Sequence, residues 1–215
     1  MCSSRFQSLH LSLVLLAGSP LATSAIILPG PVNATLTTVS MHGTGCPTNT
    51  IGVQLSNDGA VIILSFDAFQ MYYGPAYPPT QQSKNCILNL GLNYTPGYTF
   101  SVMDATYRGY ADLDLNLNAA ITSSYTTTDS QAGDAALQTR ATVSGEFAGE
   151  YTQTVAVSNG SVMSSTCGKN SYGLQVATRA ALSSRSSTAT GSLTGDPALS
   201  LGYHQLRLKW AVCKG

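Results

Sequence analysis

The chain has 215 residues, with ten basic and ten acidic side chains, and only 9% of its residues are charged. Because these charges cancel and no cluster of Lys or Arg is present, the composition argues against partners such as nucleic acid or an anionic membrane. Solubility must then come from Ser, Thr and Asn side chains and from any glycans attached to the chain.

The first 25 residues have the order of a secretory signal peptide. Arg5 supplies the positive start, residues 11–17 form an apolar segment, and the small residues Thr23 and Ala25 precede the expected cleavage point. The apolar segment is too short to span a bilayer of about 30 Å; a buried N-terminal helix is the alternative. We expect residues 26–215 to form a single secreted, extracellular domain without a lipid anchor.

Four cysteines remain once Cys2 has left with the signal peptide, namely Cys46, Cys86, Cys167 and Cys213. An even number of cysteines in an oxidising compartment predicts two disulfides. Three pairings are possible, and we favour Cys46–Cys86 with Cys167–Cys213, one bridge in each half of the chain. A metal site is disfavoured because CxxC and HxxxH spacings are absent.

Apolar and polar residues alternate along most of the chain, which predicts strands. The expected strands include residues 51–55, 61–66, 86–94, 174–182 and 206–212. The first two flank Asn57-Asp58-Gly59, a hairpin signal, and the second is apolar on both faces, as a central strand would be. A weak helical period occurs only near residues 132–140. The pattern predicts an all-β fold, a mainly antiparallel β-sandwich or jelly roll of roughly eight to ten strands.

Three Asn-X-Ser/Thr triplets are candidate glycosylation sites, at Asn33, Asn93 and Asn159. In the expected strand 86–94, Asn93 alternates with inward Leu92 and Tyr94, so its side chain should point outward.

The segment FQMYYGPAYPP places Tyr72, Tyr73 and Tyr77 in or beside a loop rich in Gly and Pro. Tyrosines on a loop can form a platform for sugar rings or a protein contact, so these three are candidate binding residues. The alternative is that they fold back as a minor core beneath the loop.

The segment RGYADLDLNLNAAI, residues 108–121, alternates polar residues with leucines. We expect one long strand with Leu113, Leu115 and Leu117 inside, and with a ladder of four outward polar residues spaced about 7 Å apart. The ladder consists of Asp112, Asp114, Asn116 and Asn118. The favoured interpretation is a solvated strand face. Asp112 and Asp114 are weak candidates for a calcium site, which would need six to eight oxygens, and weaker ones for a catalytic carboxylate pair.

No other catalytic set is evident. His42 and His204 are the histidines of the mature chain, neither belongs to a triad-like motif, and the cysteines are expected to be oxidised. Glu146 and Glu150 fit surface charges at strand ends. We therefore expect no cofactor.

Five segments together resemble a family of small secreted, mainly fungal proteins catalogued as domain of unknown function 4360. They are GTGCP at 43–47, VQLSNDGAVIILSFDAFQ at 53–70, KNCILNLGLNYTPGYTFSV at 84–102, RGYADLDLNLNA at 108–119 and LRLKWAVC at 206–213. The resemblance implies secretion, a disulfide-bonded β fold and a fungal origin. It also implies a structural or functional need at Arg108 and Asp112, such as a mutual ion pair.

The expected function is that of a non-enzymatic binding or surface-interaction module with a cell-wall glycan or a host extracellular protein as partner. The alternative is an extracellular polysaccharide hydrolase that uses surface carboxylates. A concave cleft with carboxylates on opposing walls would favour the enzyme, and a flat or convex Asp112/Asp114 face would favour the module.

Overall fold

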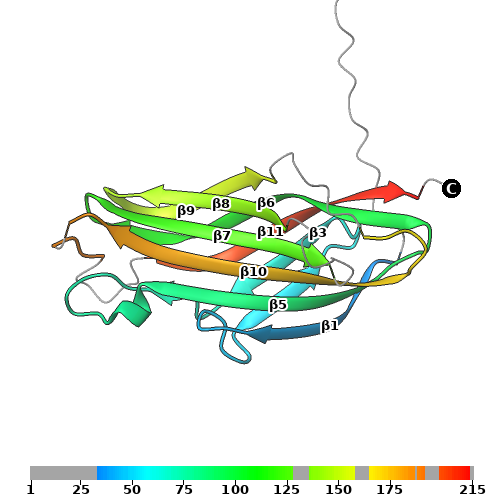
Figure 1. Cartoon of the computed structure of the whole chain (residues 1–215), viewed down its shortest axis with the longest axis horizontal. Coiled ribbons are helices and arrows are strands. Elements are labelled where there is room, and N and C mark those ends of the chain that lie inside the picture. The colour runs from blue at the N-terminus through cyan, green and yellow to red at the C-terminus, as the bar shows by residue number, and fades with distance from the viewer. Residues whose placement is uncertain (1–32, 128–135, 158–164, 187, 192–198, 214–215) are drawn as a thin grey trace, which may run out of the picture.

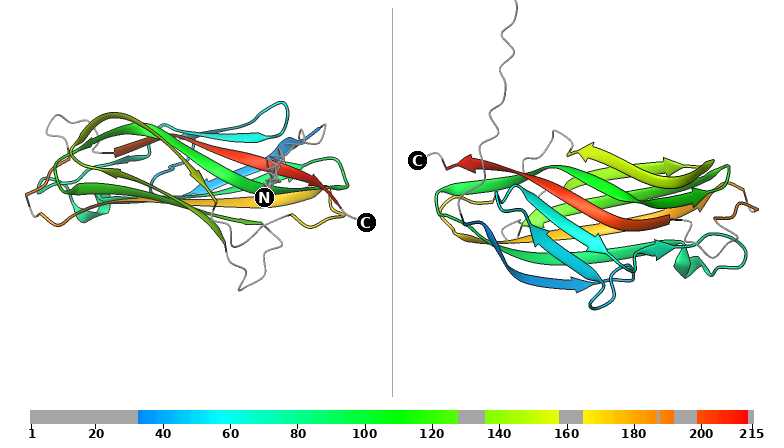
Figure 2. Two further views of the ribbon diagram at one scale, coloured as in Figure 1. Left: turned by 90° about the horizontal axis from the view of Figure 1, so that it is seen from above. Right: turned by 180° about the vertical axis from the view of Figure 1, so that it is seen from behind.

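Eleven strands form two antiparallel sheets that lie face to face in the computed structural model (Figures 1 and 2). The structure describes residues 33–127, 136–157, 165–186, 188–191 and 199–213. The predicted signal peptide lies outside these ranges. Within them, no helix is long and apolar enough to cross a membrane. The expected all-β sandwich is confirmed.

The five-stranded sheet has the strand order β1-β5-β10-β7-β8 and the six-stranded sheet the order β2-β3-β11-β6-β9, with β4 paired to β11. In the first sheet the strands are β1 (Thr35–His42), β5 (Ser83–Asn93), β10 (Ser171–Ser184), β7 (Leu117–Thr127) and β8 (Leu137–Ser144). In the second they are β2 (Ile51–Leu55), β3 (Val61–Phe66), β11 (Leu199–Val212), β6 (Tyr98–Leu113), β9 (Phe147–Ala156) and β4 (Gln70–Met71). A 3₁₀ turn, η1 (Pro79–Gln81), precedes β5.

Most strands bury one face against the opposite sheet, whereas β1 and β2 contain no fully buried residue. Alternating burial is why the period of two predicted strands such as β5 and β10. In β5, Leu88, Leu90 and Leu92 are buried whereas Asn89 and Asn93 are exposed, as expected. Strand β3 has partners on both sides, in agreement with its apolar composition.

The weak helical period near residues 132–140 does not correspond to a helix where the structure describes it, because Leu137–Arg140 belong to β8. The alternation in β8 was hidden by Thr139, a polar residue that is buried in the core. A threonine at a buried position interrupts the alternation of apolar and polar residues from which a strand is predicted.

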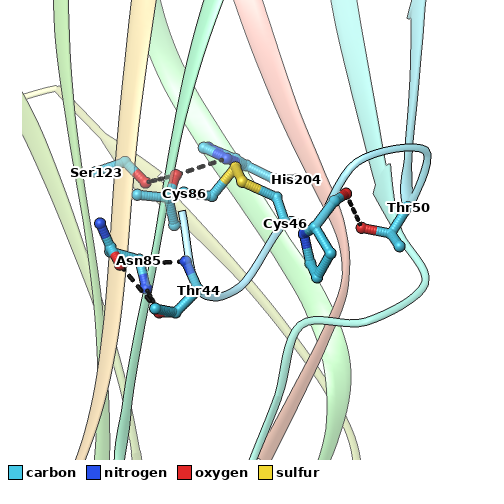
Figure 3. Close-up of a disulfide and its surroundings, with 9 residues drawn as sticks. Thr44, Cys46, Thr50, Asn85, Cys86, Ser123 and His204 are labelled. Atoms are coloured by element: carbon cyan, nitrogen blue, oxygen red, sulfur yellow. Dashed lines mark hydrogen bonds between the residues drawn. A yellow bond between two sulfur atoms is a disulfide. The ribbon is translucent and has the colours of Figure 1, made fainter. Parts of the chain in front are cut away.

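Two disulfides are present, Cys46–Cys86 and Cys167–Cys213, the pairing favoured above. The first joins the β1–β2 connection to β5 (Figure 3). The second joins the segment before β10 to the end of β11, and therefore links the two sheets at one end of the sandwich.

A cluster of polar side chains lies in the core around His204 of β11, which is fully buried. Its Nε2 lies 3.2 Å from Tyr125 Oη and its Nδ1 lies 3.5 Å from Thr178 Oγ1. Thr178 Oγ1 is in turn 2.9 Å from Ser123 Oγ, and Figure 3 shows Ser123 and His204 near the Cys46–Cys86 bridge. Burial lowers the pKa of His204 from 6.5 to about 3, so the imidazole is neutral.

Candidate functional site

A shallow hollow of about 720 Å³ lies on the outer face of the six-stranded sheet, where β11, β6 and β9 run side by side. Its lining includes Thr106, Arg108, Tyr110, Glu150, Thr152, Ser200, Tyr203 and Gln205. Sequence reasoning did not single out this surface, because its residues come from strands that are distant in the chain.

A bulge on β11 and a close approach on β6 decide which side chains face the hollow. On β11 the register skips Gly202, so Leu201 is buried, Tyr203 turns outward and His204 turns inward. The glycine is the visible signal, since a glycine inside a strand often marks a bulge. On the neighbouring β6, a Cβ at Gly109 would lie 1.9 Å from the main-chain oxygen of Ser200, so only glycine permits this close approach.

Arg108 and Glu150 form an ion pair on this face, with 2.9 Å between Nη2 and Oε2 and side chains that are 59% and 71% exposed. The expected pair of Arg108 with Asp112 is therefore wrong. Asp112 stands four residues further along β6, which corresponds to about 13 Å, whereas Glu150 lies diagonally opposite on β9. Glu150 also lies well inside β9, and not at a strand end as the sequence indicated.

Two half-buried tyrosines, Tyr110 and Tyr203, supply the aromatic part of the lining. The hydroxyl of Tyr203 donates to Oε1 of Gln205 at 2.7 Å, which orients both side chains. Hydroxyl groups of Thr106 and Thr152 complete the polar part.

Tyr72 and Tyr77 stack on each other at the edge of the same sheet, with ring centroids 5.0 Å apart and planes at 26°. The Tyr72 hydroxyl donates to Oε1 of Gln70, at 3.1 Å, and Gln70 pairs with Ser200, a residue of the hollow. Tyr73 packs instead against the core. The three candidate tyrosines thus divide into a half-exposed stacked pair beside the hollow and one core-contacting residue.

The expected long strand through residues 113–125 is interrupted. β6 ends at Leu113, a turn held by the bond from Leu117 N to Asp114 O (3.0 Å) follows, and β7 begins at Leu117 in the other sheet. Leu115 at the turn is 64% exposed, and Asn116 adopts a φ of 69°. If β6 and β7 were one strand from Tyr98 to Thr127, it would be about 100 Å long, far beyond the usual strand. The chain instead turns back and enters the other sheet. The polar residues consequently do not form one ladder.

Asp114 and Asp112 have different surroundings. Asp114 Oδ2 accepts hydrogen bonds from Thr190 N (2.9 Å) and Thr190 Oγ1 (2.6 Å), which ties the turn to residues 188–191. Asp112 lies half-buried on β6 opposite Ala148. In the part of the chain that the structure describes, no group of three or more His, Cys, Asp or Glu side chains could hold a metal ion.

Two of the three sequons can be placed. Asn33 and Asn93 are exposed, and Asn93 pairs with Thr35 at the end of β5, pointing outward as predicted. Asn159 lies outside the described residues. Occupancy by glycans stays a prediction.

Together these features define a disulfide-linked β-sandwich with a polar, tyrosine-lined hollow on one outer face. The chain belongs to the family described as Domain of unknown function (DUF4360), which matches residues 32–213 and so covers every strand of the sandwich. The resemblance found from the sequence is confirmed.

A protein of Arthroderma benhamiae named "Uncharacterized secreted protein" is 30% identical over 185 residues, which cover 86% of this chain and 74% of that protein. This relative confirms the expected secretion.

Two solved structures show weak overall similarity. TmCBM61 in complex with β-1,4-galactotriose is 8% identical, with a TM-score of 0.24 over 81% of this chain and 88% of the other. The enzymatically active domain of tailspike protein 4 from bacteriophage CBA120 is 12% identical, with a TM-score of 0.25 over 81% and 19% of the two chains. Similarity at this level says nothing about what this chain binds.

Proposed function

We propose that this secreted protein is a non-enzymatic module that binds a neutral polysaccharide of the cell wall or the surrounding medium. The supporting observation is the composition of the hollow, where two half-buried tyrosine rings stand among amide, hydroxyl and ion-paired side chains. A sugar ring has an apolar C–H face and a rim of hydroxyl groups. The rings of Tyr110 and Tyr203 can pack against the apolar face of a sugar. The side chains of Gln205, Thr106 and Thr152 can form hydrogen bonds with its hydroxyl groups.

The ion pair indicates a neutral ligand. Because Glu150 neutralises Arg108, the hollow presents no uncompensated charge to a ligand, yet both side chains can still bond to hydroxyl groups. An acidic polymer would have to displace Glu150 from Arg108, and a basic polymer would have to displace Arg108 from Glu150.

The stacked Tyr72–Tyr77 pair extends the surface beyond the hollow. Gln70, Ser200, Tyr110 and Glu150 form one row across β4, β11, β6 and β9, and three steps between strands span about 14 Å. A linear oligosaccharide that crosses the strands would reach from the tyrosine pair to the ion pair. We therefore propose that Tyr72 and Tyr77, two of the three candidate tyrosines, take part in binding.

Hydrolysis receives less support. A typical glycoside hydrolase needs two carboxyl groups that flank the scissile bond. The described lining includes one, Glu150, which is paired with Arg108, while Asp112 and Asp114 do not line the hollow.

The test is affinity electrophoresis of the purified protein through neutral glucans, mannans, galactans and solubilised chitin. We expect selective retention on one of them, and a dissociation constant at least tenfold higher, equivalent to about 1.4 kcal/mol, for Tyr110→Ala/Tyr203→Ala. Tyr72→Ala/Tyr77→Ala should weaken binding less.

Lys209→Ala is the matched control, since Lys209 is an exposed residue of β11 outside the hollow. Binding that survives in Tyr110→Ala/Tyr203→Ala, or the absence of retention on every neutral polymer, would contradict the proposal.

A further inference from the structure

The charged residues are unevenly divided between the two sheets. None of the described aspartates and glutamates lies in a strand of the five-stranded sheet, whereas Lys84, Arg140 and Arg179 do. The carboxylates occur in the strands of the six-stranded sheet and in connections, at Asp58, Asp67, Asp104, Asp112, Asp114, Glu146 and Glu150. Although the net charge of the chain is zero, the described charged residues in the strands of the five-stranded sheet are all basic.

Arg179 and Arg140 stand in one row across the outer face of the five-stranded sheet. Arg179 of β10 pairs with Thr122 of β7, and Thr122 pairs with Arg140 of β8. Two steps between strands place the Cα atoms of the arginines about 10 Å apart. On the other side of Arg179, β5 contributes Asn85 to the same row.

These two arginines lack the partners that the other sheet provides. Arg108 is paired with Glu150, and Arg207 is paired with Asp104. Within the described residues, Arg179 and Arg140 have no ion pair. The Nε of Arg179 donates to Ser83 Oγ in a long hydrogen bond of 3.4 Å, and both side chains are exposed.

A shallow trough of about 330 Å³ accompanies the row. Its lining includes Asn85, Arg179, Thr122, Ser124 and Gln138, and Gln138 stands two residues before Arg140 on β8. The amide oxygen of Asn85 accepts a hydrogen bond of 2.9 Å from Thr44 Oγ1, which fixes the orientation of this amide (Figure 3). The trough thus combines hydroxyl and amide groups with a guanidinium that has no ion pair among the described residues.

We propose that this face is a second binding surface, for a polysaccharide that carries carboxylate groups, such as a chain of uronic acids. Arg179 and Arg140 each bind one carboxylate of the chain, because a guanidinium matches a carboxylate in a bidentate geometry. Asn85, Thr122, Ser124 and Gln138 bond to hydroxyl groups of the sugars between them.

The spacing of the arginines selects this polymer over nucleic acid. Duplex DNA carries one charge per about 1.7 Å and is held by many basic contacts. Two cations about 10 Å apart suit a chain with one charge per sugar ring. A glycan on Asn93 would leave the row open, since Asn93 lies eight residues from Asn85 along β5, about 26 Å away.

The experiment measures binding to polygalacturonate at low ionic strength and at 0.15 M salt, for the full mature chain. We expect retention that falls as salt rises, a severalfold loss for Arg179→Gln or Arg140→Gln, and a loss of at least tenfold for the double variant. Lys209→Gln removes the same charge from the six-stranded sheet and should change binding little.

Tyr110→Ala/Tyr203→Ala should leave this binding intact, so that failure of the hollow and failure of the arginine row are distinguishable. The proposal is overturned by an equal loss in Lys209→Gln, by unchanged binding in the double arginine variant, or by a lack of retention on polygalacturonate. It is also overturned if dextran sulfate or duplex DNA binds more tightly than the uronic-acid chain.

Discussion

The two outer faces of the sandwich arise from the same alternation of residues but present different surfaces. On the six-stranded sheet, bulges in the β6–β11 pairing shift the register, and both arginines that bear on the face are paired with carboxylates. On the five-stranded sheet, β10 pairs with β5 and β7 without a shift, and the outward Arg179 and Arg140 form no ion pair with another described residue. The comparison teaches that bulges create a recess with re-aimed side chains, whereas an uninterrupted register creates rows.

The two sheets also meet through a few identifiable links. One disulfide joins their ends, the cluster around His204 connects them inside the core, and the Asp114 turn carries the chain from one to the other. Each link can be removed to learn how far the two faces depend on each other.

The largest effect is expected from the disulfides. Each bridge closes a loop with a sequence separation of 40 or 46 residues, and the chain-entropy model assigns a loop of this size about 4 kcal/mol. Cys167→Ala/Cys213→Ala should therefore lower the free energy of unfolding by about that amount in denaturant titrations. Cys46→Ala/Cys86→Ala should cost at least as much, since both residues are buried.

Peptide mapping of the oxidised protein is the accompanying control. Fragments in which Cys46 is joined to Cys167 or Cys213 would contradict the pairing. A loss of less than about 1 kcal/mol in the Cys167/Cys213 variant would show that the core alone holds the sheets together.

A smaller effect, dependent on pH, is expected from His204. Its pKa is about 3 in the folded protein and near 6.5 when exposed, so between these values the unfolded chain binds more protons. The stabilisation is complete above pH 6.5 and is lost as the pH falls, by about 1.4 kcal/mol per unit, or about 2.7 kcal/mol at pH 4.5.

Stability curves of the wild type and His204→Gln between pH 7.5 and about 4.5 measure this slope while most carboxylates stay ionised. The variant should be less stable at neutral pH and its curve flatter. Equal slopes in the two proteins would rule out His204 as the titrating group.

The smallest effect distinguishes the two aspartates that looked equivalent in the sequence. Asp114→Asn should cost about 1 kcal/mol, because the two hydrogen bonds from Thr190 to the ionised Oδ2 become weaker bonds to a neutral amide oxygen. Asp112→Asn, the matched control, should change stability by no more than about 0.5 kcal/mol, as an ordinary surface position would.

Thermal melts with calcium and with chelator complete the comparison. We expect no shift. A rise of several degrees with calcium that disappears in Asp114→Asn would restore the calcium interpretation.

Much of the fold was predictable because it depends on local alternation. In β5 and β10 the inward residues are regularly spaced and, apart from Thr178, apolar, so strand, buried face and outward Asn93 all followed from the sequence. The prediction failed where local pattern and tertiary context diverge. Leu115 continues the alternation perfectly, yet it is exposed, because the sandwich needs a turn at that point and Asn116 can adopt a positive φ.

The sequence by itself indicated secretion through its N-terminal pattern, the family through five matching segments, and the disulfides through the cysteine count. It also determined the β class and the parity of most strands, since these depend on a period of two. Only the tertiary structure decided the candidate sites. The hollow joins β11, β6 and β9, and the arginine row joins β10, β7 and β8, strands that are distant in the chain and are brought together by cross-strand register. Register depends on bulges such as the one at Gly202 and on which strands become neighbours, and neither is encoded within a single strand.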